Sequence, residues 1–327
     1  MVQQVIVHAS PLQKDIVQPI AYDIYGRQAT SYLPYTAATA NGAYQTGAIA
    51  AQQAFYQQTG QQIATDSAPY AVTTYDQSPL DRVVESGAPG SNWQPGSNHT
   101  VKPVFRLNVS ADNIRIWTTA GPSGSYYGVT QLSVNDVSDE NGYHSLTFTN
   151  KLGQMVEKKV QGDAGIWLET VYIYDDLGNL NYKISPEGVK RLYGGSVSVS
   201  WGAPFITAWA CVYTYDAKNR LVSKQAPGAV PVYMVYDSYN RLVLVQDGRI
   251  RNAYGSTDKW YFTKYDATNR VVLSGLYSYV APPNPVGSTN QQILQNYLDG
   301  LTYDNVTTFA YEKRSAGTSA TGSLTSC

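Results

Sequence analysis

The sequence predicts a mainly β fold, in which consecutive antiparallel β-hairpins curl into part of a β-shell, with two short helices. Three observations predict it: a Tyr-Asp phrase that recurs along the chain, β-branched and aromatic runs on both sides of it, and a composition suited to strands. Tyr occurs 28 times in 327 residues, and charged residues make up only 14%. Tyr, Thr and Val fit a pleated, half-buried surface, so the composition favours extended structure.

The phrase has six clear copies. In five of them Gly or Asn stands three residues after the Asp, and Arg often comes next. The residues that define the copies are Tyr22, Asp23 and Gly26; Tyr75 and Asp76; Tyr174, Asp175 and Gly178; Tyr215, Asp216 and Asn219; Tyr236, Asp237 and Asn240; and Tyr265, Asp266 and Asn269. A worn seventh copy runs from Thr149 to Gln154.

Each copy predicts a turn between two strands. The Asp side chain can accept a hydrogen bond from the backbone N–H two residues on, which starts a type I turn. Gly and Asn tolerate the positive φ that follows such a turn in a common hairpin connection. Because the Asp recurs in every copy, we expect it to cap its own turn rather than to act as a catalytic acid or a calcium ligand.

The segments around the copies predict the remaining organisation. Strand-like runs are residues 1–7, 171–174, 211–215, 221–222, 232–236, 242–245, 259–265 and 271–273. Ala- and Gln-rich residues 44–58 and the capped, one-sided residues 288–298 predict the two helices. We expect an elaborated N-terminal module over residues 1–165, regular hairpins over 166–314 and a disordered tail over 315–327.

Composition argues against several function classes. The net charge is −1 and no long basic run occurs, so we expect no nucleic-acid partner. Two cysteines, Cys211 and Cys327, and three histidines predict neither a disulfide framework nor a metal site. No apolar window is long enough for a membrane span, and the first seven residues lack the features of a signal peptide. No nucleotide, cofactor or hydrolase motif is present, so we expect no cofactor and no enzyme activity.

The phrase and its context resemble the Rhs/YD-repeat proteins, and in detail their Bacteroidetes-type members. Besides the Tyr-Asp copies, the matching segments are Ser10–Pro19, Tyr32–Tyr35, Gly87–Gly90, Trp93–Gly96 and Asp139–Gly153. The resemblance covers roughly residues 2 to 280 and comprises the N-terminal module and the first repeats. It implies a secreted or cell-surface protein whose repeats form a hollow β-shell around a C-terminal toxin or effector.

This chain departs from that pattern. It contains no Asp-Pro dipeptide, which the family's self-cleaving core carries, and only a small-residue tail follows the repeats. Encapsulation and cleavage are therefore not carried over to this polypeptide. The expected partners are the remaining shell repeats or a C-terminal effector of a parent protein.

The leading hypothesis is a non-enzymatic scaffold segment that encloses or presents a partner or toxin. The alternative is a carbohydrate-binding or adhesive surface module. The six Trp residues are expected mainly to pack between hairpins. Trp201 and Trp209 lie in a Gly- and Ser-rich stretch and are the candidates for stacking against a glycan. A third class, an enzyme with two converging carboxylates, would need acidic side chains that no turn uses.

Overall fold

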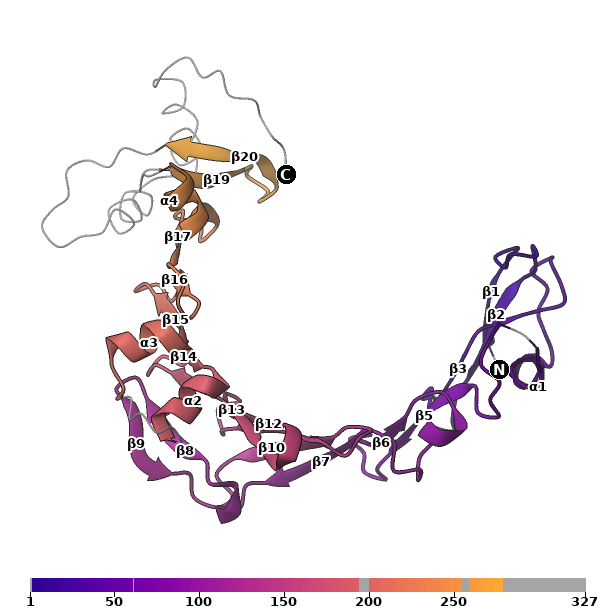
Figure 1. The fold of residues 1–327 in the computed structure, drawn as a ribbon. Coiled ribbons are helices and arrows are strands. Elements are labelled where there is room, and N and C mark those ends of the chain that lie inside the picture. Colours follow the sequence, from indigo (N-terminus) through magenta and orange to yellow (C-terminus); the bar gives the residue numbers. More distant parts are fainter. Residues whose placement is uncertain (1, 61, 194–199, 255–258, 279–327) are drawn as a thin grey trace, which may run out of the picture. The chain divides into compact units, whose positions relative to one another are not determined.

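The computed structural model describes residues 2–60, 62–193, 200–254 and 259–278 (Figure 1). The chain divides into two compact units. Unit 1 comprises residues 1–114 and 127–168. Unit 2 comprises residues 115–126 together with the chain from 169 onwards. The units are discontinuous in sequence, because one hairpin of the N-terminal half, residues 115–126, folds with the later repeats.

Unit 1 contains one antiparallel sheet and part of a second. Its strands are β1 (Val2–Ile6), β2 (Ile16–Ala21), β3 (Thr30–Tyr32), β4 (Tyr35–Thr36), β5 (Tyr70–Tyr75), β6 (Val83–Gly87), β7 (Lys102–Leu107), β10 (Ser133–Ser138), β11 (His144–Thr149) and β12 (Met155–Gln161). The first sheet has the order β1-β2-β3-β5-β6, and β4 pairs with β2. The second runs β7-β10-β11-β12. A bridge between Ser86 and Val101 links them.

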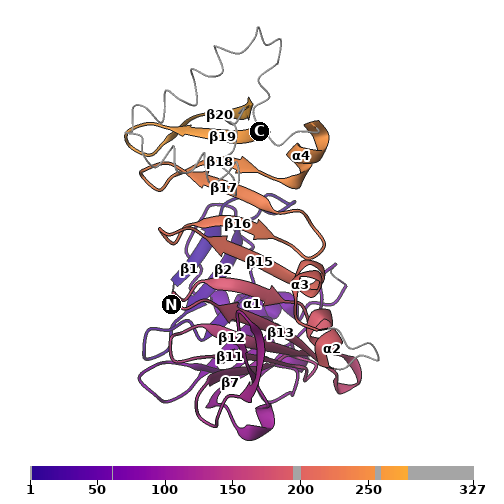
Figure 2. The ribbon, with the colours of Figure 1, turned by 90° about the vertical axis from the view of Figure 1, so that its left-hand side faces the viewer.

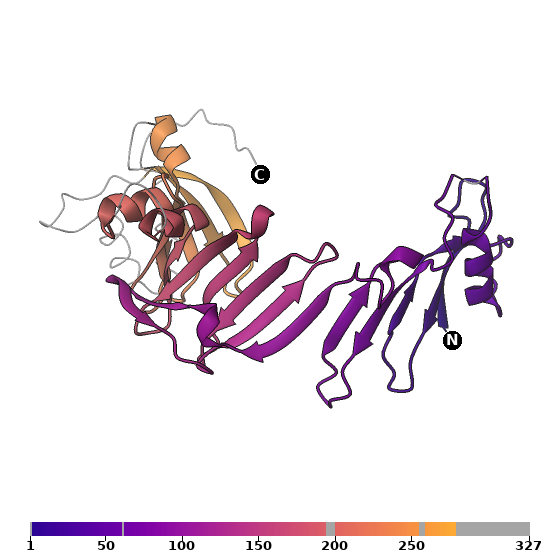
Figure 3. The same ribbon diagram turned by 60° about the horizontal axis from the view of Figure 1, so that its bottom comes forward.

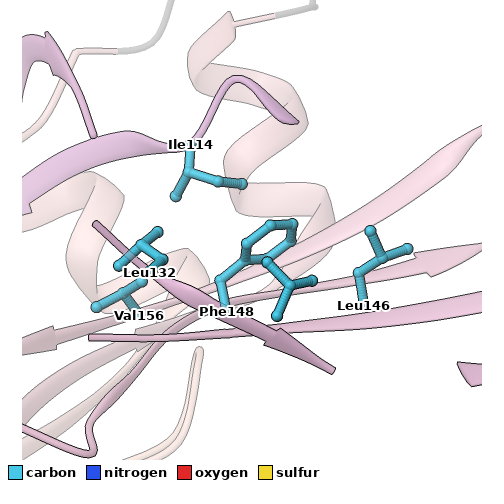
Figure 4. Close-up of a cluster of buried hydrophobic side chains, with 6 residues drawn as sticks. Ile114, Leu132, Leu146, Phe148 and Val156 are labelled. Atoms are coloured by element: carbon cyan, nitrogen blue, oxygen red, sulfur yellow. The ribbon is translucent and has the colours of Figure 1, made fainter. Parts of the chain in front are cut away.

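Two apolar clusters hold unit 1 together. In the second sheet, Phe148 is fully buried and packs with Ile114, Leu132, Leu146 and neighbouring side chains (Figure 4). In the first sheet, helix α1 (Ala48–Tyr56) lies against β2 and β4 (Figure 3) and buries its first residue. Short 3-10 turns at Ser91–Trp93, Ser110–Asp112 and Asp163–Gly165 complete the unit.

Unit 2 is a regular meander. Its strands are β8 (Arg115–Thr118), β9 (Gly121–Tyr126), β13 (Trp167–Tyr174), β14 (Leu180–Ile184), β15 (Ala210–Tyr215), β16 (Leu221–Gln225), β17 (Val232–Tyr236), β18 (Leu242–Gln246), β19 (Lys259–Tyr265) and β20 (Val271–Ser278). Strands β13 to β20 pair in chain order, whereas β8 and β9 form a separate hairpin. Tyr-Asp turns connect the strands at one end of the sheet. Helices α2 (Pro186–Tyr193), α3 (Ala203–Trp209) and α4 (Gly248–Tyr254) belong to connections at the other end (Figure 2).

The core of unit 2 is richest near its helices. Ile173 and Ile184 are buried on the sheet against Phe205 of α3. The β8–β9 hairpin packs onto this cluster through Trp117, whose ring lies 6.0 Å from that of Trp201. This contact explains why a hairpin from the N-terminal half folds with unit 2.

The predicted strands are confirmed. The runs at 171–174, 211–215, 232–236 and 259–265 lie in β13, β15, β17 and β19, and the runs behind the turns begin β16, β18 and β20. The predicted fold class of antiparallel hairpins is therefore correct.

The prediction of helices needs a correction. The helix expected over 44–58 is confirmed as α1, and the one expected over 288–298 lies outside the described residues, as does the tail over 315–327. Two short helices were too few, because the described ranges contain α2, α3 and α4 as well. These have only seven or eight residues each. Helices α2 and α4 begin at Pro186 and Gly248, and α3 follows Gly202, and such residues are assigned to loops by sequence patterns. None of the helices in the described ranges combines the length and the apolar run that crossing a bilayer requires.

Candidate functional site: the ladder of Tyr-Asp turns

The turn at Asp237–Arg241 shows how one copy folds. The backbone N–H of Asp237 donates to the carbonyl of Arg241 (3.0 Å), and the N–H of Asn240 donates to the carbonyl of Asp237 (3.1 Å). The Asp237 carboxylate accepts from the backbone N–H groups of Tyr239 and Arg241, both at 2.9 Å. Its other oxygen accepts from Arg241 Nε at 2.6 Å. One carboxylate thus satisfies the backbone of the turn and orients the following arginine.

The same bonds recur in the other copies. Asp23, Asp216 and Asp266 each accept two backbone N–H groups and the Nε of the arginine four residues on. Asp175 makes the equivalent bonds with Asn179 in place of arginine. The paired strands shift register by one residue at each of these turns in unit 2. A type I turn followed by a bulge residue therefore closes each hairpin.

The residue after the type I turn has positive φ throughout. The angles are 78° at Gly26, 85° at Gly178, 62° at Asn219, 61° at Asn240 and 64° at Asn269. An L-residue with a branched or bulky side chain is strained in this region. The conformation accounts for the restriction of this position to Gly and Asn in these copies.

The copy at Tyr75 has a longer turn with the same kind of hydrogen bonds. Asp76 accepts the backbone N–H groups of Ser78 and Arg82 and also binds Arg82 Nε at 2.7 Å. Asp81 occupies the left-handed position with φ of 46°. Asp81 is therefore the counterpart of the Gly or Asn of the other copies, although it stands six residues after the tyrosine.

Two further turns follow the rule without a Tyr-Asp pair. Asn150 of the worn copy accepts the backbone N–H groups of Leu152 and Gln154 through its side-chain oxygen. Asp139 accepts those of Asn141 and Tyr143. Sequence reasoning did not count the second turn as a copy, although an Asp with Gly three residues later was a sufficient signal.

Neighbouring copies are joined by their arginines. Arg220 Nη1 donates to the carbonyl of Asp237 (3.3 Å) and to Asn240 Oδ1 (3.1 Å) of the next copy. Arg241 Nη1 donates in the same way to the carbonyl of Asp266 (3.1 Å) and to Asn269 Oδ1 (3.3 Å). We call this chain of turn-to-turn bonds the turn ladder.

The ladder has the same pattern at two other junctions. Arg27 binds the Asp81 carboxylate, and Asn179 Nδ2 donates to Asn219 Oδ1. In all four cases, the strand that follows one copy pairs with the strand that precedes the next. In each, the acceptor side chain belongs to the residue with positive φ. The left-handed residue thus both closes its own turn and accepts from the preceding one.

The tyrosines of the phrase bind the preceding hairpin. The hydroxyls of Tyr215, Tyr236 and Tyr265 donate to the carbonyls of Leu180, Leu221 and Leu242, at 3.2, 2.9 and 3.0 Å. Each acceptor is the first residue of the strand after the preceding turn. The guanidinium carbons of Arg220 and Arg241 lie 5.3 Å from the ring centroids of Tyr236 and Tyr265, which is within cation–π range. Burial raises the pKa of the Tyr236 hydroxyl.

Burial along the ladder is uneven. The side chain of Asp237 is 0% exposed and that of Arg241 is 9% exposed, whereas Asp266 and Arg270 are 24% and 79% exposed. Backbone N–H donors, above all that of Arg270, hold the pKa of the Asp266 carboxyl well below its usual range. The backbone N–H of Arg27 is likewise the main cause of the lowered pKa of Asp23. The Asp23 and Asp266 carboxylates therefore accept hydrogen bonds within their own turns as anions.

Few polar groups outside the turns converge. Among the described residues no group of three or more His, Cys, Asp or Glu side chains could hold a metal ion. His144 Nδ1 lies 2.7 Å from Asp136 Oδ1, beside an open pocket of about 330 Å³ that Val101, Tyr143 and Val160 help to line. The pocket wall is mainly apolar.

The two candidate sugar-stacking tryptophans have protein neighbours. The Trp201 ring lies 5.6 Å from Tyr182 and 5.7 Å from Phe205, and a Cβ added at Gly121 would come within 2.8 Å of it. The guanidinium carbon of Arg191 lies 4.4 Å from the Trp209 ring centroid. Both rings therefore pack within unit 2, and glycan stacking at either stays a prediction.

Comparisons with known proteins give limited matches. The family described as "Domain of unknown function (DUF6443)" matches residues 1–106. A search of curated proteins gives no match to this chain.

Three solved structures are similar at low identity. They are the crystal structures of TcdB2-TccC3-TEV (TM-score 0.47, 14% identity) and TcdB2-TccC3-Cdc42 (0.49, 14%), and the Photorhabdus luminescens Tc holotoxin pore with a mutated TccC3 (0.47, 13%). The matches cover 81%, 81% and 84% of this chain and 10%, 10% and 11% of those chains. This chain thus spans about a tenth of their length.

Proposed function

We propose that this chain is a non-enzymatic structural scaffold, a segment of an Rhs/YD-repeat β-shell in a secreted or cell-surface protein that encloses or presents a partner or toxin. The observation that carries the proposal is the turn ladder. Its carboxylates, arginines and tyrosines are engaged with the chain itself, within one turn or between neighbouring turns. Repeated polar residues that hold one hairpin to the next build a sheet that grows by addition of hairpins.

The arrangement of edges supports the same proposal. Strand β20 is the terminal strand of its sheet, and the described residues pair it only with β19. Unpaired strand edges are templates for further strands, and proteins usually protect them with charge, proline or cover. Outer residues of β20 are instead apolar, with Val271 60% and Val272 54% exposed. An apolar strand edge is expected in a scaffold segment if further repeats pair with that edge.

Hydrogen exchange on the full chain tests the proposal. A backbone-cyclised peptide carrying residues 232–246, the β17–β18 hairpin, serves as a minimal further repeat, because cyclisation lowers the entropy cost of ordering it. Addition of the peptide should slow amide exchange in β20 and in the turn at Asp266–Arg270, and should leave β1 to β6 unchanged. If amide exchange in β20 were the same with and without the peptide, the proposal would be contradicted.

A glycan array with the same protein tests the alternative. Specific glycan binding that Trp201→Ala or Trp209→Ala abolishes, without loss of folding, would favour the carbohydrate-binding module. The scaffold proposal expects no such binding. The same protein preparation also tests the enzyme hypothesis: the scaffold proposal expects that it does not hydrolyse the arrayed glycans.

A further inference from the structure

Arg270 is the last arginine of the ladder among the described residues. Its Nε binds Asp266 Oδ2 at 2.7 Å, as the equivalent arginines bind their own aspartates. The Nη atoms of Arg220 and Arg241 continue to the next turn, and these side chains are 8% and 9% exposed. The Arg270 side chain is 79% exposed, and its Nη atoms meet no acceptor within the described part of the chain.

Strand β20, which follows Arg270, corresponds to the strands that pair with the next copy at the inner junctions. At the inner junctions, the strand after the turn pairs with the first strand of the next copy, as β16 with β17 and β18 with β19. The backbone carbonyl of its first residue accepts the tyrosine hydroxyl of that copy, as Leu221 and Leu242 do. Val271 is the corresponding residue of β20, and its side chain is 60% exposed.

We infer that Arg270, together with the β20 edge, is a recognition site for one kind of partner: an antiparallel hairpin with a Tyr-Asp turn and Asn or Asp at its left-handed position. The inference rests on the proposed function and names the partner of the open edge. Arg270 Nη1 donates to the incoming Asp carbonyl and to the side-chain oxygen of the left-handed residue. The incoming tyrosine lies beneath the guanidinium and donates its hydroxyl to the Val271 carbonyl.

The chemistry of the junctions gives the site its selectivity. Each of the four observed junctions uses a side-chain oxygen at the left-handed position: Asp81, Asn219, Asn240 or Asn269. Glycine closes the turn equally well but has no side chain to accept the bond. Copies with glycine, such as those of Gly26 and Gly178, are therefore disfavoured as partners of Arg270.

The test is a double-mutant cycle on the full chain. Fluorescence anisotropy measures binding of the labelled cyclic peptide of residues 232–246 to the wild type and to Arg270→Gln. It then repeats both titrations with a peptide in which Asn240 is replaced by Gly. Each single change should weaken binding at least tenfold. The two changes together should weaken it less than the product of their separate effects, because both remove the contact between Arg270 and Asn240. The control protein is Arg82→Gln, whose arginine is 47% exposed and binds Asp76 of its own turn, and its affinity should equal that of wild type.

Each outcome decides the inference. Amide exchange of Arg270→Gln without peptide must match wild type in β19 and β20, so that lost binding is not lost folding. Tight binding that the two changes do not affect, or affect independently, would overturn the role of Arg270 and leave the scaffold proposal standing. No binding to wild type would mean that this edge is already covered, by this chain's own later residues or by a second copy, and would overturn both.

Discussion

The turn at Asp237–Arg241 and the turn at Asp266–Arg270 have the same internal bonds and very different surroundings. Their Asp–Arg contacts measure 2.6 and 2.7 Å, yet the Arg241 side chain is 9% exposed and that of Arg270 is 79% exposed. The inner turn is covered by the next copy, whereas the described residues place no further copy against the outer turn. The comparison teaches that local sequence determines the turn, whereas the neighbouring hairpin determines how much each polar contact contributes to stability.

The largest expected effect comes from removing the inner carboxylate. Asp237→Ala removes the carboxylate that forms the ion pair with the buried Arg241 and the acceptor of the Tyr239 and Arg241 backbone N–H groups. Loss of one member of a buried ion pair costs about 3–5 kcal/mol. Urea unfolding followed by tryptophan fluorescence should show this loss, and Asp266→Ala should show a clearly smaller one. Equal losses for the two variants would refute the comparison.

A smaller effect is expected at the left-handed residue. Asn240→Ala imposes positive φ on alanine, which costs about 1–2 kcal/mol, and it also removes the acceptor of Arg220. Asn240→Gly removes only the acceptor and should cost about 0.5–1.5 kcal/mol. The same denaturation measurement separates the two contributions. If glycine destabilised as much as alanine, backbone strain would not be the reason for Asn at this position.

The tyrosine hydroxyls should contribute about 1 kcal/mol each. Tyr236→Phe removes the 2.9 Å bond to the Leu221 carbonyl and retains the ring beneath Arg220. The matched control is Tyr22→Phe in the first copy, where the tyrosine is 56% exposed. Thermal unfolding should distinguish them: a lower midpoint is expected for the first variant and no change for the second.

The smallest expected effect is on the pH dependence of stability. The pKa values of Asp23 and Asp266 are lowered in the folded chain, so each contributes stability that is present above the ordinary carboxyl pKa near 4. That stability is lost as pH falls through the lowered folded values. Thermal midpoints should therefore be level above about pH 5 and decrease below pH 4. Asp266→Asn should decrease less steeply, and an unchanged slope would contradict the assigned role.

Much of the fold could be predicted because its signals are local. Asp237 and Asn240 are three residues apart, and their hydrogen-bonding and φ preferences are sufficient to specify a turn without any distant contact. The short helices could not be predicted in this way. Helix α3 begins at Ala203 after a Gly-containing segment and buries Phe205 against the sheet, so tertiary packing rather than propensity stabilises it.

The contacts between turns that form the ladder could not be predicted from the sequence. Arg220 and Asn240 are twenty residues apart, and their contact requires that β16 and β17 pair in one register. Likewise, assignment of the β8–β9 hairpin to unit 2 depends on the packing of Trp117 against Trp201, a contact across 84 positions.

By itself, the sequence determined the hairpins, their turn residues and the strands on both sides, because side-chain-to-backbone bonds over four residues and the two-residue period of strands act within short segments. Only the tertiary structure decided which turns lie side by side and which arginines of the described residues are buried, like Arg241, or exposed, like Arg270. The physical reason is that burial and inter-turn bonding depend on strand register, which is set by the whole sheet.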